Sequence, residues 1–267
     1  ASSTGSSWSN HFDEFLKSKY NDNYQLHNVA ISAIGNDLIS FNCIKVIQSL
    51  LDNEVDYNDI KVIIQWSGLN RQSKYVKSSV DVQMNVDFQE INNKHYNIRN
   101  DSNYKFINPA GKYKFNGYWG LYFEKFFHTS EAFRNTLDNI LKIQWYLKSV
   151  NIKYKMFTAW DIFTTTDLKN QNILDRLFGN GDKVNQFSDK VYSNKKNKLY
   201  KEEFLQISHM WDMIDWSNFW TFKNSKVKFG GMMQWIQTNV FRKRWYVSRE
   251  DKHPSSVSAK QFMESVI

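Results

Sequence analysis

Residues 60–66, with the sequence IKVIIQW, are the clearest candidate for a buried strand. β-Branched side chains fill most of this run, which is typical of a strand buried on both faces of a parallel sheet. Residues 152–157 (IKYKMF) predict a second strand, and long amphipathic segments separate the two. Because strands joined by long helical crossovers pair in parallel, the sequence predicts an α/β fold with a mostly parallel sheet.

The predicted helices are segments in which apolar residues recur at helical spacing. Residues 37–51 carry one apolar stripe, and residues 130–149 carry another behind Ser130, a candidate N-cap, with Glu131 in the first turn. The remaining expected elements are helices at 8–20, 168–178, 202–214, 232–238 and 255–267, a strand at 25–31 and a polar loop at 180–198.

Residues 71–129 differ from the rest of the chain because they are polar, rich in aromatic residues and alternating in places. Residues 80–86 (VDVQMNV) are the clearest alternating run, with the two-residue period of a strand that has one polar face. We therefore expect a β-rich insertion, a hairpin with loops, over one end of the sheet. The whole chain, residues 1–267, is expected to form a single domain.

Composition excludes several classes of protein. Of the 267 residues, 41% are hydrophobic and 16% aromatic, enough apolar surface to exclude global disorder. Apolar runs are too short for a membrane-spanning helix, and residues 1–7 lack the basic start and apolar run of a secretory signal. The single cysteine, Cys43, excludes an internal disulfide and a cysteine-based zinc site.

The net charge of +8 indicates affinity for anionic surfaces. The positive charge is scattered, with its densest runs at 195–198 and 241–245 (FRKRW), so we expect no specific nucleic-acid partner. No metal site is expected, because the histidines lack the spacing of metal ligands. No phosphate-binding glycine loop occurs, and we expect no cofactor.

Three short segments carry the residue types of a hydrolytic site. In residues 249–255 (REDKHPS), a carboxylate precedes His253 just before a predicted helix. Either Asp251 or Glu250 is positioned to orient the imidazole, whose other nitrogen then serves as a general base. A surface histidine beside ordinary charges is the competing interpretation.

The other two segments each follow a predicted strand. Residues 28–37 (NVAISAIGND) lead into a helix and offer backbone N–H groups at the carboxyl edge of the sheet. Residues 65–71 (QWSGLNR) offer the side-chain amide of Asn70 as an oxyanion donor. Ordinary tight turns, with Asn36 or Asp37 as a helix cap in the first, are the competing interpretation.

In their order along the chain, these segments resemble the sequence blocks of the SGNH (GDSL-like) hydrolase family, most closely its divergent members from bacteriophages and other large DNA viruses. Gly35 matches the oxyanion glycine, and residues 68–70 match the family's Gly-x-Asn, although Arg71 replaces the usual Asp. The final block departs in spacing: Asp251 stands one residue closer to His253 than usual, and Glu250 occupies the expected register.

The resemblance implies a three-layer α/β/α sandwich of flavodoxin-like type, with a nucleophilic serine at the end of the first strand. The chain begins at Ala1 with no apolar strand before Ser2, our first candidate nucleophile, followed by the serines at positions 3, 6 and 7. Two explanations stay open: the sequence begins inside the first block, or the protein has lost that block.

The implied function is a serine ester hydrolase that removes O-acyl groups from a carbohydrate, with Ser2, His253 and Asp251 catalytic and with Gly35 and Asn70 as the oxyanion hole. The resemblance also implies a virion or the cytoplasm of an infected cell as location, and other virion proteins as partners. The alternative is a catalytically inactive structural or glycan-binding protein of a virus particle. A nucleic-acid-binding protein is a third interpretation, which rests on net charge alone.

Overall fold

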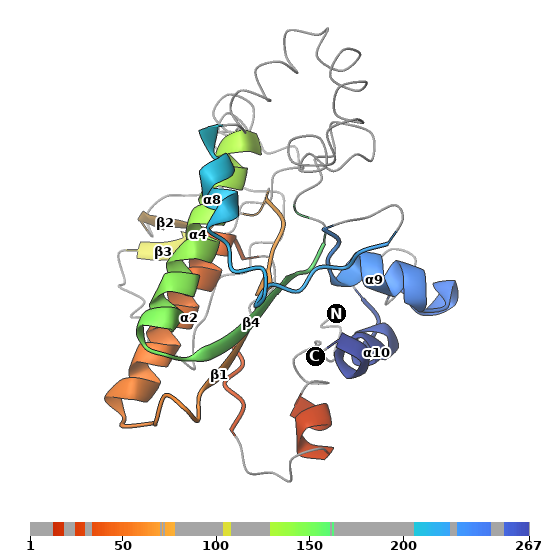
Figure 1. The fold of residues 1–267 in the computed structure, drawn as a ribbon, viewed down its shortest axis with the longest axis horizontal. Helices are drawn as coiled ribbons and strands as arrows, with labels where there is room; N and C mark the ends of the chain where they lie inside the picture. The colour runs from red at the N-terminus through yellow and green to blue at the C-terminus, as the bar shows by residue number, and fades with distance from the viewer. Residues whose placement is uncertain are drawn as a thin grey trace, which may run out of the picture. The chain divides into compact units, whose positions relative to one another are not determined.

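Two compact units make up the fold in the computed structural model (Figure 1). The larger unit comprises Ile31–Phe157 and Ile162–Trp220, and the smaller unit comprises Ala1–Ala30, Thr158–Asp161 and Thr221–Ile267. The structure describes residues 13–18, 25–29, 34–69, 71, 73–77, 104–107, 129–160, 162, 206–224, 229–246 and 254–266.

A two-stranded parallel sheet of β1 (Lys61–Trp66) and β4 (Lys153–Thr158) organises the larger unit. Both strands and their parallel pairing confirm the sequence prediction. Residues 218–220 run parallel to β4 as well: Met156 N donates to Asn218 O at 2.8 Å, and Trp220 N donates to Met156 O at 2.8 Å. The protein is therefore a mixed helix-and-strand fold with parallel strand pairing.

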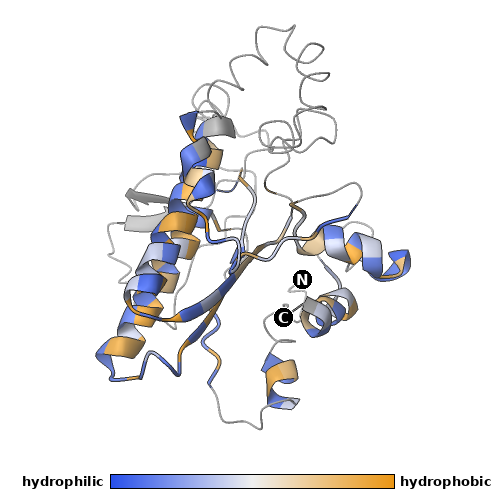
Figure 2. Cartoon of the chain, in the orientation of Figure 1, coloured by the Kyte–Doolittle hydropathy of each residue, from blue (hydrophilic) through white to orange (hydrophobic). Residues whose placement is uncertain are grey.

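Two long helices, α2 (Asn36–Asp52) and α4 (Thr129–Ser149), pack against each other in the larger unit. Figure 2 shows both apolar and polar residues along each helix, as expected for amphipathic helices. Asn151 ends α4 in the left-handed conformation, with φ 57°, and Ile152 N donates to Leu147 O at 2.9 Å. This ending turns the chain directly from α4 into β4.

The predicted insertion contains an antiparallel pair, β2 (Lys74–Lys77) with β3 (Tyr104–Ile107). Its register places Lys74 opposite Ile107 and Lys77 opposite Tyr104. The alternating run at residues 80–86, from which the hairpin was predicted, lies outside the described residues.

The smaller unit contains α9 (Met232–Asn239), the 3₁₀ turn η3 (Arg242–Arg244) and α10 (Ser256–Val266). The rings of Trp235 on α9 and Phe262 on α10 meet edge to face with centroids 5.5 Å apart, and Phe262 is fully buried. Both predicted helices are confirmed within a residue or two at each end.

Other predicted elements are found in part. The described residues of the expected helix at 8–20, residues 13–18, are helical. Helix α8 (Ser208–Asp212) lies within the predicted 202–214, of which residues 202–205 lie outside the described residues. Residues 25–29, the described part of the expected first strand, have no regular secondary structure and include no buried residue. The expected helix at 168–178 and loop at 180–198 lie outside the described residues. In the part of the chain that the structure describes, no helix combines the length and apolar character needed to cross a membrane.

Candidate functional site

The candidate site is the N-terminus of α2 together with the loop that follows β1, because both lie where the sequence predicts oxyanion donors. Among the predicted site residues, Gly35 is described by the structure. Ser2, Asn70, Asp251 and His253 lie outside the described residues, as do Glu250 and the other candidate serines at positions 3, 6 and 7.

Gly35 is the residue that caps α2. Its backbone is extended, with φ −78° and ψ 161°, and its carbonyl accepts the first helical hydrogen bond, from Ile39 N at 3.1 Å. Its N–H points away from the helix and donates to Ser73 Oγ at 2.9 Å. The predicted oxyanion donor is therefore paired with a serine hydroxyl in this structure.

Asn36 joins the helix to the end of β1. The Ser67 N–H donates to Asn36 Oδ1 at 2.8 Å, and Asn36 Nδ2 donates to Ser67 O at 3.2 Å. The same Nδ2 donates to Thr136 Oγ1 on α4 at 3.0 Å. Because Asn36 is only 5% exposed, these bonds form away from water and hold α2, α4 and the β1 loop in one arrangement.

Ser73, which follows the β1 loop, forms a second connection to α2. Ser73 N donates to Asp37 Oδ1 at 3.2 Å, in addition to the bond that Ser73 Oγ accepts from Gly35. Within the loop, Arg71 N donates to Gly68 O at 3.1 Å. The loop that contains Gly68 and Asn70 is thus bonded to residues 35–37 through Ser67 before it and Ser73 after it.

Sequence reasoning missed Asn36, Ser67, Ser73 and Thr136 as members of this site. It treated Asn36 as a candidate cap, whereas the cap is Gly35, and the Asn36 amide is buried between elements. A signal was available in the polar residues at helical spacing, Asn36 with Ser40 on α2 and Thr136 with Asn139 on α4. Ser40 Oγ donates to Asn139 Oδ1 at 2.8 Å, so these residues form a polar row between the two helices.

A separate carboxylate centre surrounds Asp215. Lys148 Nζ lies 2.8 Å from Asp215 Oδ2, and Ser217 N and Asn218 Nδ2 each donate to this carboxylate at 3.2 Å. Lys148 and these hydrogen bonds hold the pKa of Asp215 well below its usual range. Burial, and then repulsion from Asp215, raise the pKa of Tyr154 to about 12. The arrangement joins α4, β4 and residues 215–218 and is structural.

The segment directly after His253 is fixed within the smaller unit. Ser255 precedes α10, and its Oγ accepts from Ser258 N at 3.2 Å, which is the geometry of a helix N-cap. Ser255 N donates to Trp245 O at 3.1 Å, and Pro254 forms a bridge with Tyr246. The start of α10 is thereby joined to the end of η3.

Among the described residues, no three His, Cys, Asp or Glu side chains gather in a group that could hold a metal ion. The polar network around Asn36 consists of amides, hydroxyls and backbone groups, with Asp37 as its carboxylate. Such groups suit the binding of a polar or developing anionic oxygen. No protein-family model matches the chain, and neither curated proteins nor solved structures give a significant match.

Proposed function

We propose that the protein is a serine ester hydrolase of SGNH type that removes O-acyl groups from a carbohydrate. The proposal includes a three-layer α/β/α sandwich. The parallel pair of β1 and β4 and the packing of α2 against α4 support this architecture. The proposed setting, a virion or the cytoplasm of an infected cell, rests on the resemblance alone.

One observation carries the proposal. Ser67 and Ser73, which flank Asn70 in sequence, both form hydrogen bonds with residues 35–37. The two segments expected to supply the oxyanion donors, 35–37 and 67–73, are therefore neighbours although they are far apart along the chain. Of the two segments, 67–73 follows the carboxyl end of β1, and the carboxyl ends of parallel strands are the usual place for a ligand site in an α/β fold.

In the proposed mechanism, a serine hydroxyl attacks the acyl carbonyl and His253 accepts its proton. Asp251 or Glu250 holds the imidazole. The Gly35 N–H and the Asn70 amide stabilise the tetrahedral oxyanion, which replaces Ser73 Oγ as the acceptor for Gly35. Loss of one such donor raises the activation free energy by about 3 kcal/mol. His253 then returns the proton to the departing alcohol, and water, deprotonated by His253, releases the acid from the acyl-enzyme.

The test is labelling of the purified chain with a fluorophosphonate probe, followed by mass spectrometry of the labelled peptide. We expect one modified serine, Ser2 or one of those at positions 3, 6 and 7. The His253→Ala variant should lose the label and at least about 100-fold in ester hydrolysis, because the nucleophile then has no base. His209→Ala removes an exposed histidine on α8 and serves as the matched control. Full activity in His253→Ala would reject the assignment.

The second candidate function is a catalytically inactive structural or glycan-binding protein of a virus particle. The observation that favours it is the occupied Gly35 N–H, because a donor already bonded to Ser73 is available to an oxyanion only after that bond breaks. Absence of labelling in a folded chain that binds acylated glycans would support this second function over the first.

A further inference from the structure

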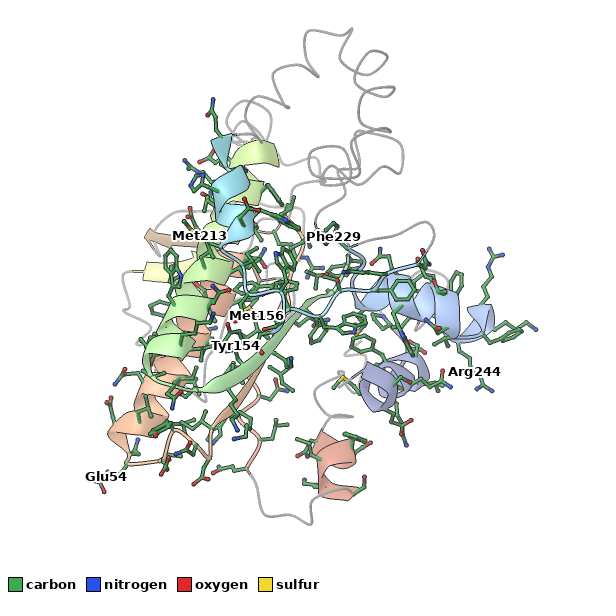
Figure 3. All side chains as sticks on the ribbon, viewed as in Figure 1. Glu54, Tyr154, Met156, Met213, Phe229 and Arg244 are labelled. Atoms are coloured by element: carbon green, nitrogen blue, oxygen red, sulfur yellow. The ribbon has the colours of Figure 1, made fainter. Side chains whose placement is uncertain are left out.

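The strongest surface feature outside the candidate site is an exposed basic turn in the smaller unit. We name it the basic knuckle and define it as residues 241–245 (FRKRW). The three cations of η3, Arg242, Lys243 and Arg244, are all exposed, and Phe241 is 68% exposed. Figure 3 labels Arg244. Three exposed cations beside a largely exposed aromatic ring form a surface suited to a partner.

The backbone of the knuckle is held in place. Trp245 Nε1 donates to Val240 O at 2.7 Å, and Arg244 N donates to Phe241 O at 2.8 Å. From α10, Ser255 Oγ donates to Arg244 O, and Ser258 Oγ donates to Trp245 O at 3.2 Å. A turn fixed in this way loses little backbone entropy when it binds a partner.

The geometry of η3 favours separate contacts over one small anion shared by all three cations. A 3₁₀ turn has about three residues per turn, so successive side chains project about 120° apart. Arg242, Lys243 and Arg244 therefore spread around the turn and do not converge on one point. Spread cations suit a polymer with repeated negative charges, each of which meets a different side chain.

The knuckle is connected to the segment that carries the predicted catalytic histidine. Tyr246, directly after the knuckle, forms a bridge with Pro254, and Pro254 follows His253 in the chain. The knuckle is therefore joined, through Tyr246, to Pro254, the residue that follows the proposed general base in sequence.

We infer that the basic knuckle binds an acidic polysaccharide, so that the substrate is an O-acylated glycan with repeated carboxylate or sulfate groups. The guanidinium groups form paired hydrogen bonds with planar carboxylates, and the Phe241 ring offers an apolar face to a sugar ring. The choice of a carbohydrate rests on the proposed function. A lipid surface fits less well, because Phe241 is the one strongly exposed apolar side chain of the knuckle.

The test measures binding of polygalacturonate to the purified chain at several salt concentrations. We expect Arg242→Ser/Lys243→Ser/Arg244→Ser to bind at least about tenfold more weakly and with a shallower salt dependence, because three contacts to the polyanion are lost. The matched control, Lys61→Ser/Lys153→Ser/Lys223→Ser, removes the same charge from other exposed positions and should bind as the parent does. Circular dichroism of both variants verifies folding.

Equal weakening in the two triple variants would overturn the inference, because net charge alone would then explain binding. Tighter binding of single-stranded DNA, or of phosphatidylserine vesicles, than of polygalacturonate would overturn it as well. Binding needs no turnover, so its failure is distinguishable from failure of the hydrolase proposal. A chain that binds polygalacturonate through the knuckle but takes no fluorophosphonate label supports polysaccharide binding at the knuckle and contradicts the hydrolase, and with it the glycan's role as substrate. A chain that takes the fluorophosphonate label but does not bind polygalacturonate supports the hydrolase proposal and contradicts this inference.

Discussion

Asn36 and Ser67 exchange two hydrogen bonds: Ser67 N donates to Asn36 Oδ1 at 2.8 Å, and Asn36 Nδ2 donates to Ser67 O at 3.2 Å. The side-chain amide of Asn36 thus pairs with the backbone of Ser67 in the way that one strand pairs with another. Both residues are buried, at 5% and 7% exposure, so water cannot replace either bond. The first turn of α2 is thereby bonded to the loop after β1.

Asn36→Ala should lower the free energy of unfolding by about 2–4 kcal/mol, because both backbone groups of Ser67 lose their bond to the Asn36 amide inside the protein. Urea denaturation at pH 7 measures this change. Asn53→Ala is the control, since Asn53 is exposed at the end of α2 and its substitution should change stability by less than about 0.5 kcal/mol. Equal stability of the two variants would contradict the assigned role of Asn36.

Gly231→Ala should destabilise the protein by about 1–3 kcal/mol through overpacking. A Cβ at this position would lie 2.4 Å from Thr158 O, 2.6 Å from Thr158 Oγ1 and 2.7 Å from Trp160 O. Two of these atoms are backbone oxygens and cannot rotate away. Thr238→Ala, on the exposed side of α9, is the comparison and should shift the urea midpoint little. Unchanged midpoints for both variants would show that the chain near Gly231 has room for a methyl group.

Asp215→Asn should lower the free energy of unfolding at pH 7 by about 1 kcal/mol, because it removes the charge that Lys148 pairs with. The pKa of the Asp215 carboxyl is lowered in the folded protein. Its contribution is therefore fully present above the unfolded pKa of about 3.9 and is lost as the pH falls below that value toward the folded pKa. The stability difference between parent and variant should accordingly shrink below about pH 4.

Urea denaturation between pH 7 and pH 2.5 follows this difference. Lys148→Gln removes Lys148, the first cause of the lowered pKa of Asp215. It should reproduce much of the stability loss of Asp215→Asn and its dependence on pH. Lys153→Gln, which removes an exposed lysine of β4, should leave the pH profile unaltered. A constant gap between parent and Asp215→Asn across this pH range would contradict the ion pair as its source.

Cys43 should react with a disulfide reagent at pH 8 at least about 100-fold more slowly in the folded protein than in the unfolded chain. Burial in α2 raises the pKa of the thiol to about 12. The reagent therefore reaches the sulfur slowly, and little of the thiol is in the reactive thiolate form. The protein has a single cysteine, and labelling therefore has one source. Unfolding in guanidinium should release one reactive thiol per chain. Rapid labelling without denaturant would mean that α2 opens readily.

Local pattern was sufficient for the elements with strong periodicity. The helix predicted at 37–51 extends over Asn36–Asp52, and the strand predicted at 60–66 extends over Lys61–Trp66. Such elements are decided by the spacing of apolar residues, which a sequence displays directly. The expected strand at 25–31 shows the limit of this method. Its described residues are not buried, and an apolar run becomes a strand only where a partner and a buried face exist.

The candidate site was predictable in its segments but not in its bonds. Small residues and amides that follow predicted strands indicate Gly35 and the loop after β1 as candidate donors. Ser73, which occupies the Gly35 N–H, and Thr136, which accepts from Asn36, come from distant parts of the chain. Which hydroxyl meets which amide depends on how α2 and α4 pack, and no local pattern contains that information.

The sequence by itself determined the alternation of helices and strands, the parallel pairing of β1 with β4 and the buried stripes of α2 and α4. Periodicity and crossover length are local properties, and they suffice for these features. Only the tertiary structure decided that Asn36 bonds to Ser67, that Gly231 must lack a Cβ and that Asp215 pairs with Lys148. Each of these depends on short-range contacts between residues far apart in sequence, which exist only after the elements have packed.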